Sequence, residues 1–244
     1  SRADGFVRIG RNREIVDADE DVEVTLIGQA SPVADLVVIG SHCVGLDLIA
    51  SALSEEGFRV KLLAVGSQAG LDAAARGECD VAPIHLLDPE TGEYNRSFVT
   101  SEMNLLPGYG RMQGIIFRKE EGRDAEVLMS DPEARMVNRN RGAGTRILID
   151  TLLEGRRPLG YAYEPRSHHA VAAAVAQGRA DWGVTISNVA HSAGLGFHPL
   201  QDESYDFVVP KSRWEKPAVR RLRELLQPDS EVRRALSEAG FKVG

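Results

Sequence analysis

The sequence has few cysteines, no long apolar run and no excess of basic residues. The two cysteines among its 244 residues, Cys43 and Cys79, are too few for a disulfide framework and lack CxxC spacing. They favour a reducing, cytoplasmic setting. No apolar run reaches the roughly 18 residues of a membrane-spanning helix, so we expect no membrane contact. The formal net charge of −7 argues against a nucleic-acid partner, which requires a basic face.

The sequence also lacks the motifs of metal and hydrolase sites. No HExxH motif or Cys/His ligand spacing is present, and the adjacent His168 and His169 at a helix start face different directions. We therefore expect no metal. Ser41, His42 and Asp47 invite comparison with a hydrolase, but no GxSxG nucleophile elbow accompanies them. We therefore expect this segment to be non-catalytic by itself.

Residues 1–30 differ in pattern from the rest of the chain. Residues 6–9 and 22–27 alternate between apolar and polar side chains, as half-buried strands do. No helical pattern lies between them. We therefore predict a small β segment, the tail of a preceding β domain, with a linker at residues 28–32.

From Asp35 onward the pattern is strand, loop and helix, repeated. Repeats of this kind form a parallel sheet with right-handed crossovers, which makes the fold class α/β. The predicted strands are residues 36–39, 58–65 and 79–84, and the predicted helices are residues 44–54 and 69–76.

A second set of strand–helix units follows, so we predict two lobes with a ligand cleft between them. Strands near residues 113–117 and 205–209 are predicted to cross between the lobes. Residues 105–110 are predicted to be irregular, and residues 160–164 to form a short extended piece. The predicted boundaries are 31–117 with 204–244 for lobe 1, and 118–203 for lobe 2.

The stretch from Met136 to Arg146 carries the clearest chemical signal. A short apolar run leads into a turn that holds Arg139, Gly142 and Gly144, and a helical pattern begins near Thr145. Unpaired N–H groups in the first turn of a helix, together with its dipole, favour bound anions. Arginine adds a planar fork that matches oxyanions. We therefore predict an anion site here, with Thr145 both capping the helix and donating its hydroxyl.

Two other anion-binding motifs match this stretch less well. A dinucleotide fingerprint would need a third glycine where Ile147 stands, so the partial GxG is weak support. A P-loop would need a Gly-Lys-Ser/Thr sequence, which does not follow. Which of Arg139, Arg141 and Arg146 points inward stays open at this point.

Two loops of the first lobe share one form, a strand end followed by Gly-Ser and a helix start. Ser41 and Ser67 occupy equivalent positions, and each is predicted to be an N-cap. His42 and His85 lie beside them. Because ligands of such sheets bind at the carboxyl ends of the strands, these loops are predicted to form the facing half of the site. A site with donors alone favours an anion without protons, whereas a neutral His42 or His85 nitrogen would admit a protonated or organic ligand.

Several motifs between residues 36 and 244 match those of one family. They include Gly40-Ser-His42, Asp80 to Asn95, Arg111-Met-Gln-Gly114, Val137 to Arg146, His169-Ala-Val-Ala172, Gly178 to Asp181 and Glu203-Ser-Tyr-Asp206. On these motifs, residues 36–244 resemble a periplasmic-binding-protein-like domain of the type related to molybdate- and tungstate-binding proteins. The resemblance implies a two-lobed type II periplasmic-binding-protein fold with molybdate or tungstate held between the lobes and no covalent cofactor.

Ala3-Asp-Gly-Phe6 and Asp19-Glu-Asp-Val-Glu-Val24 are the matching pieces of the first 28 residues. With these pieces the segment resembles the end of the last β domain of molybdopterin molybdenumtransferase, an enzyme of molybdenum cofactor biosynthesis. This implies a binding domain that serves that pathway, with a molybdopterin-handling domain in the same chain as its partner and a homo-oligomer as a further option. The alternatives are an effector domain for a small organic ligand such as a pterin, or a part of the molybdenum-insertion enzyme. The candidate ligand-binding residues are Ser41, His42, Ser67, His85, Arg111, Arg139, Gly142, Gly144, Thr145, His169, Thr185 and Tyr205.

Overall fold

A computed structural model describes residues 5–17, 20–27, 33–119 and 123–243, and divides the chain into the units Ser1–Ala34 and Asp35–Gly244. In the first unit, β1 (Gly5–Val7) pairs antiparallel with β2 (Val24–Leu26). This confirms the predicted β segment. The linker predicted at residues 28–32 lies outside the described residues.

The first lobe of the larger unit follows the predicted strand–helix pattern. Strand β3 pairs in parallel with β4, and Val38 forms a parallel bridge with Val81 just before β5. Helix α1 buries Leu46, Ile49 and Leu53 at the spacing of one helical face. The elements of this lobe are β3 (Leu36–Gly40), α1 (Val44–Glu55), β4 (Val60–Ala64), α2 (Ser67–Ala75), β5 (Ala82–Ile84), α7 (Pro217–Leu225) and α8 (Glu231–Glu238).

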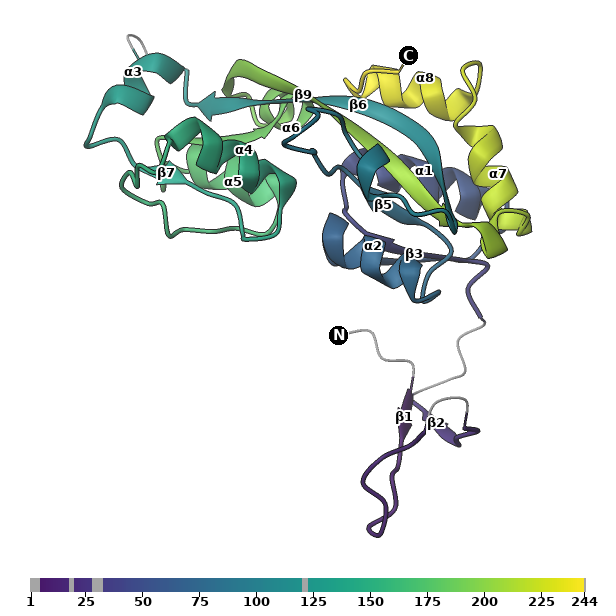
Figure 1. Cartoon of the computed structure of the whole chain (residues 1–244). Helices are drawn as coiled ribbons and strands as arrows, with labels where there is room; N and C mark the ends of the chain where they lie inside the picture. The colour runs from purple at the N-terminus through teal and green to yellow at the C-terminus, as the bar shows by residue number, and fades with distance from the viewer. Residues whose placement is uncertain (1–4, 18–19, 28–32, 120–122, 244) are drawn as a thin grey trace. The chain divides into compact units, whose positions relative to one another are not determined.

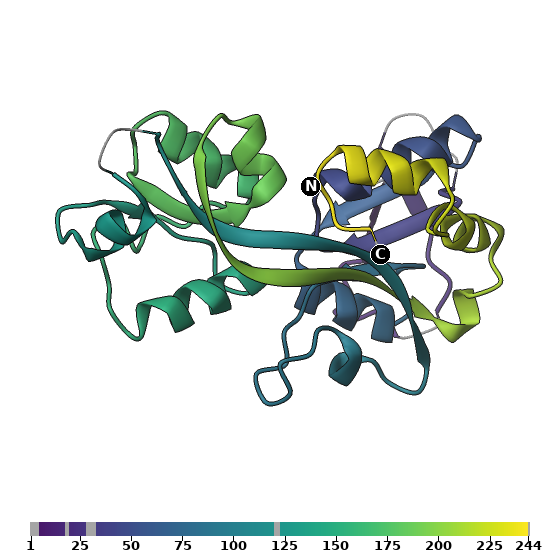
Figure 2. The same cartoon turned by 90° about the horizontal axis from the view of Figure 1, so that it is seen from above.

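Two long strands run through both lobes (Figures 1 and 2). Strands β6 (Met103–Phe117) and β9 (Gly196–Pro210) pair antiparallel along their whole lengths. The irregular segment predicted at residues 105–110 is therefore wrong. Its Pro-Gly sequence sits at a β-bulge, where a Cβ on Gly108 would lie 2.1 Å from the carbonyl oxygen of Tyr205. Glycine is needed here because the two strands' backbones approach each other closely, and not because the chain turns.

The second lobe is built on the far ends of these two strands. Strand β8 pairs antiparallel with β6 and in parallel with β7, and the five-stranded sheet has the order β5-β9-β6-β8-β7. Residues 160–164 form turns and coil rather than the predicted extended piece. The elements of this lobe are α3 (Ala125–Ser130), β7 (Met136–Val137), α4 (Gly144–Leu153), α5 (His168–Ala176), β8 (Trp182–Ile186) and α6 (Ser187–Ser192).

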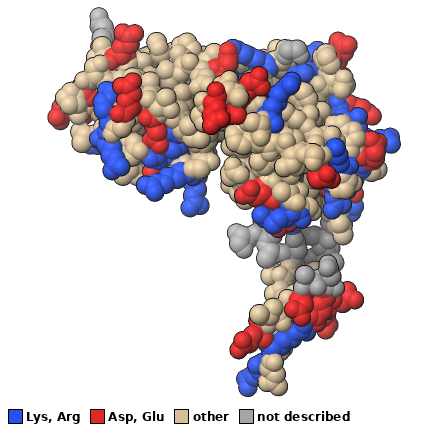
Figure 3. Space-filling view, viewed as in Figure 1, with Lys and Arg blue, Asp and Glu red and all other residues tan. Residues whose placement is uncertain are grey.

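The surface of the larger unit is hollowed between its two lobes in the view of Figure 3. Acidic and basic side chains are both present on this face, and several basic side chains gather along the lower edge of the left-hand lobe. Among the residues that the structure describes, no helix has the length and apolar character needed to cross a membrane.

The buried side chain of Asn95 ties the end of β5 to β9. Its Oδ1 accepts from the backbone of Leu86 at 2.7 Å, and its Nδ2 donates to Asp206 at 2.7 Å and to the carbonyl of Ser204 at 3.1 Å. Its backbone adopts φ +67°, a left-handed conformation that asparagine tolerates better than most residues. Asn95 therefore fixes the positions of His85 and Glu203, each one residue away from these contacts.

We expect Asn95→Ala to lower the free energy of unfolding by about 2–4 kcal/mol, because it leaves buried partners unpaired and strains the backbone. Urea denaturation followed by circular dichroism measures this change. Asn12→Ala, at an exposed position, is the control and should change the free energy of unfolding by less than about 0.5 kcal/mol. Equal midpoints for the two variants would contradict the role given to Asn95.

Candidate functional site

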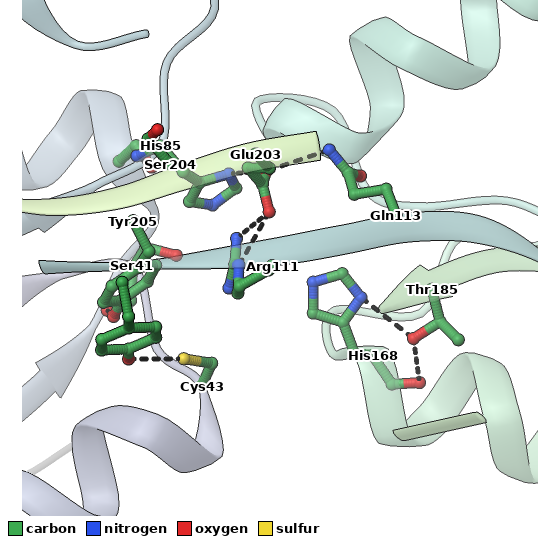
Figure 4. Close-up of polar contacts among 12 residues, drawn as sticks. Ser41, Cys43, His85, Arg111, Gln113, His168, Thr185, Glu203, Ser204 and Tyr205 are labelled. Atoms are coloured by element: carbon green, nitrogen blue, oxygen red, sulfur yellow. Dashed lines mark hydrogen bonds and ion pairs between the residues drawn. The ribbon is translucent and has the colours of Figure 1, made fainter. Parts of the chain in front are cut away.

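A buried carboxylate, Glu203 on β9, organises the polar groups at the junction of the lobes (Figure 4). Its Oε1 accepts from His85 Nδ1 at 2.6 Å and from Gln113 Nε2 at 3.0 Å. Its Oε2 accepts from Arg111 Nε at 2.7 Å and also contacts Nη2 of the same guanidinium. These contacts occupy the acceptor positions of both oxygens, so Glu203 orients its neighbours rather than offering itself to a ligand.

A second polar group comes from the other lobe. Arg139, which follows β7, is 7% exposed and donates from Nη1 to His168 Nδ1 at 3.1 Å. His168 Nδ1 also lies 3.1 Å from the hydroxyl of Thr185 on β8. His168 and Arg111 face each other in Figure 4. The two groups therefore meet at the lobe junction, with an arginine on each side.

Three buried donors in this region, Arg111 Nη1, Arg139 Nε and Thr145 Oγ1, have neither a hydrogen-bond nor an ion-pair partner within the described part of the chain. One acceptor of the cluster, Gln113 Oε1, is also unpaired. A buried donor left unpaired costs about 1–3 kcal/mol, and more when it is charged. Unpaired buried polar groups usually mark a site where a ligand, ion or water completes the bonding. The chemistry that would satisfy all three donors is that of an oxyanion.

The electrostatics of the cluster point the same way. Burial and the nearby Arg111 lower the pKa of Arg139 to about 10, so both arginines stay charged at neutral pH. Burial raises the pKa of Glu203, but Arg111 and His85 outweigh it and the net result is a pKa of about 2. Burial, followed by the two arginines, lowers the pKa of His168 well below its usual value. Burial also lowers that of His85, although Glu203 opposes the effect.

Three helices that begin near the junction lack side-chain caps. Helices α1, α2 and α4 begin after Cys43, Gly66 and Ala143, and none of these residues accepts a side-chain bond from the helix. Helix α5, which carries His168, is capped by Ser167. Free N–H groups and the helix dipole both favour an anion at uncapped ends.

The N-caps predicted at Ser41, Ser67 and Thr145 are therefore wrong. The backbone N–H of Ser41 continues the sheet, donating to the carbonyl of Pro83 at 2.9 Å, so α1 starts further along the chain. Gly66, at φ +92°, takes the cap position of α2, and the Oγ of Ser67 accepts from the backbone of His85 at 3.1 Å. Thr145 lies inside α4.

The other predicted residues divide into buried and exposed groups. Tyr205 is fully buried, its ring stacks 4.7 Å from the Arg111 guanidinium, and its hydroxyl donates to the carbonyl of Ser41 at 2.6 Å. His42 is exposed and bonds to Asp47 at 2.8 Å. The exposed predicted residues outside the cluster are His42, Gly142 and His169.

The three arginines of the turn differ in their surroundings. Arg141 is exposed. Arg146 is buried, but it pairs with Asp150 at 2.9 Å and with Glu164 at 2.7 Å, so its charge is already compensated. Arg139 has no carboxylate among its hydrogen-bond partners. Of the three, Arg139 is the one that joins the cluster.

Sequence reasoning missed Glu203, Gln113 and His168 as parts of the site. A signal for Glu203 existed, because it alternates with the buried Tyr205 and Phe207 on one face of β9. Within the described residues, no group of His, Cys, Asp and Glu side chains is arranged to hold a metal ion.

We expect the stability of the ligand-free protein to fall as pH is lowered from 7 to 5. His85 and His168 have lowered pKa values in the folded state, so below about 6.5 the unfolded chain binds protons that the folded chain does not. Each histidine contributes a slope of up to about 1.4 kcal/mol per pH unit. Urea denaturation at several pH values between 5 and 7 measures how the free energy of unfolding depends on pH.

The neighbouring residues His168 and His169 provide a matched pair of variants for this pH dependence. His168→Gln should reduce the slope, whereas His169→Gln, at an exposed position, should leave it unchanged. Glu203 contributes little above about pH 5.5, because its carboxyl is ionised in the folded state and almost fully ionised in the unfolded chain there. The assignment is wrong if the two variants have the same slope.

Comparisons with known proteins identify the superfamily and the fold of the larger unit. Residues 50–227 match the model of the PBP superfamily domain. The chain is 33% identical over 158 residues to the uncharacterized protein YvgK of Bacillus subtilis, a match that covers 60% of this chain and 51% of that relative. The chain thus spans about half the length of this curated relative.

Solved structures with a similar fold include two that concern phosphate. One is an ABC-type phosphate transport receptor from Vibrio cholerae, with a TM-score of 0.61, 12% identity and coverage of 86% of this chain and 100% of that one. Another is a phosphate ABC transporter substrate-binding protein with bound phosphate from Clostridium perfringens, with a TM-score of 0.68, 10% identity and coverage of 86% and 99%.

A third similar structure is the C-terminal domain of a probable LysR family transcriptional regulator from Rhodococcus, with a TM-score of 0.57, 18% identity and coverage of 78% and 97%. At these identities the likeness shows the fold alone. The predicted fold class, a two-lobed α/β fold of the periplasmic-binding-protein type, is thereby confirmed.

Proposed function

Because the chain belongs to the PBP superfamily, whose domain model matches residues 50–227, we propose that it is a binding domain for a small tetrahedral oxyanion held between its lobes. The observation that carries this proposal is the set of unpaired buried donors on Arg111, Arg139 and Thr145. One oxyanion between the lobes would accept from all three. It would also lie close to both arginines, whose charges repel each other without it.

The charges of the cluster support a ligand of this kind. Arg111 and Arg139 are positive, Glu203 is negative, and neutral His85 and His168 leave the cluster with a net charge of +1. A buried net charge is costly, so the cluster favours an anionic partner. Uncapped helix ends at α1, α2 and α4 add to the positive potential.

A small cavity lies beside the cluster, bordered by His85, Gln113, Gly144 and Glu203. It has room for about one water molecule, so the lobes would have to separate for either a tetrahedral oxyanion or a fused organic ring system to enter. A small organic ligand such as a pterin therefore stays the alternative to an inorganic oxyanion.

Molybdate and tungstate are the first ligands we propose, on the resemblance of the sequence motifs to molybdate- and tungstate-type domains. Phosphate is the comparison ligand, because a similar fold carries bound phosphate. A cytoplasmic role in molybdenum cofactor biosynthesis, with a molybdopterin-handling domain as partner, belongs to the same proposal. Isothermal titration calorimetry with molybdate, tungstate, sulfate and phosphate tests it, and an absence of heat with all four would exclude it.

We expect Arg139→Ala to weaken oxyanion binding about 10- to 150-fold, because a charge-assisted bond contributes roughly 1.5–3 kcal/mol. Calorimetry at constant ionic strength measures the change in Kd. The matched control is Arg141→Ala. Arg141 lies two residues from Arg139, carries the same charge and is exposed. It should change Kd by less than about threefold. Equal losses in the two variants would mean that charge alone, and not the buried donor, attracts the anion.

A further inference from the structure

The hydrogen bond between His85 and Glu203 defines which nitrogen of His85 carries the proton. Glu203 is an ionised carboxylate that accepts at 2.6 Å, so Nδ1 of His85 must be the donor. A neutral His85 then has a lone pair on Nε2. Within the described residues, Nε2 has no hydrogen-bond partner, although Gly144 of the other lobe lies against the same ring. The site therefore contains a base that is free to receive a proton.

His168 has the opposite tautomer. A guanidinium has no lone pair, so Arg139 Nη1 must donate to His168 Nδ1 across their 3.1 Å separation. The proton of neutral His168 is therefore on Nε2, the nitrogen on the side of Arg111 in Figure 4. Receiving a second proton would break the bond to Arg139. His168 is thus a fixed donor, and of these two histidines His85 is the one that can change its charge.

The net charge of the cluster with a bound anion explains why His85 would take up a proton. The cluster has a net charge of +1 when both histidines are neutral, so a dianion between the lobes would leave −1 in a buried site. One proton on Nε2 of His85 makes the complex neutral and converts this nitrogen into a further donor to the ligand. A monoanion, by contrast, gives a neutral complex without any proton.

We propose that His85 couples the uptake of one proton to the binding of a doubly charged tetrahedral oxyanion, and so discriminates ligands by charge. This rests on the proposed oxyanion function and adds the ligand's charge as a criterion. In the binding step a solvent proton forms a bond with Nε2 of His85, and that N–H donates to a ligand oxygen. No electron is transferred, and the proton returns to solvent when the anion dissociates.

The surroundings of His85 are consistent with this role. Glu203 stabilises a positive His85, whereas Arg111 and Arg139 oppose it until an anion screens them. The Tyr205 ring stacks 6.1 Å away, and Tyr94 borders the adjacent cavity. The charged or titratable side chains that face His85 are Glu203 and Tyr205 on β9, Arg111 on β6, Arg139 after β7, His168 on α5 and Tyr94 before β6.

Tungstate and perrhenate provide a matched pair of probes, because both are tetrahedral oxyanions of a heavy metal and they carry two and one negative charges. Calorimetry of each anion in two buffers of different ionisation enthalpy, at pH 7.5, gives the number of protons taken up. We expect about one proton with tungstate and none with perrhenate. Between pH 7 and 8.5, tungstate affinity should rise up to tenfold per unit decrease in pH.

Two variants assign the proton to His85. His85→Gln should bind tungstate more weakly and without proton uptake, so its Kd should lose its pH dependence. His42→Gln, which alters an exposed histidine of the neighbouring loop, should keep an uptake of about one. Measurements on the unaltered protein test the coupling even if His85→Gln fails to fold.

The outcomes separate the coupling from the oxyanion function. Tungstate binding without proton uptake would overturn the coupling and leave the oxyanion function standing. Uptake that persists in His85→Gln would overturn the assignment to this histidine. Binding of neither anion, nor of molybdate, sulfate or phosphate, would overturn the function and the coupling together.

Discussion

The ion pair between Glu203 and Arg111 is the interaction on which the binding region depends. Both side chains are almost completely buried, and they come from β9 and β6, the two strands that run through both lobes. Breaking such a pair would leave an uncompensated charge in the interior. The carboxylate also bonds His85, from the end of β5, and Gln113. One carboxylate thus fixes the groups that the first lobe and the long strands contribute.

The second lobe contributes positive groups without a matching carboxylate. Arg139 is buried, bonds the neutral His168, and keeps one N–H unpaired. Together with uncapped helix ends, this leaves the ligand-free junction electrostatically strained. The apolar cores on both sides, for example around Trp182 in one lobe and Phe207 in the other, oppose that cost. An anion that enters therefore removes an existing repulsion in addition to forming new bonds.

Much of this fold could be predicted from local sequence, and the reasons are visible in particular residues. The apolar run at β3 and the helical spacing of Leu46, Ile49 and Leu53 agree with their final structure. The full length of β6 is not predictable in this way, because the Pro-Gly sequence before Tyr109 suggests a turn. Only the carbonyl of Tyr205, brought close by β9, shows why glycine is needed there. That contact joins residues almost a hundred positions apart, so no local pattern contains it.

The site could be predicted in part for a similar reason. The turn with Arg139 and Gly144 was recognisable from its composition, but the choice among the three arginines depends on partners from other segments. His168 and His169 look alike in sequence. Helical spacing distinguishes them, because His168 shares a buried face with Val171 and Val175. Whether such a polar residue on an apolar face bonds a ligand or a neighbour is decided by tertiary contacts alone.

The glycine at position 144 has a consequence for how the lobes can approach each other. A Cβ atom there would lie 2.9 Å from both the carbonyl oxygen and Nδ1 of His85, closer than such atoms normally come. The first turn of α4 and the end of β5 are therefore separated by no more than the van der Waals radii of backbone atoms. At this point any larger residue would act as a spacer and hold the two halves of the binding region apart. The absence of one methyl group thus sets the minimum gap, and with it the size of the ion that the closed molecule can enclose.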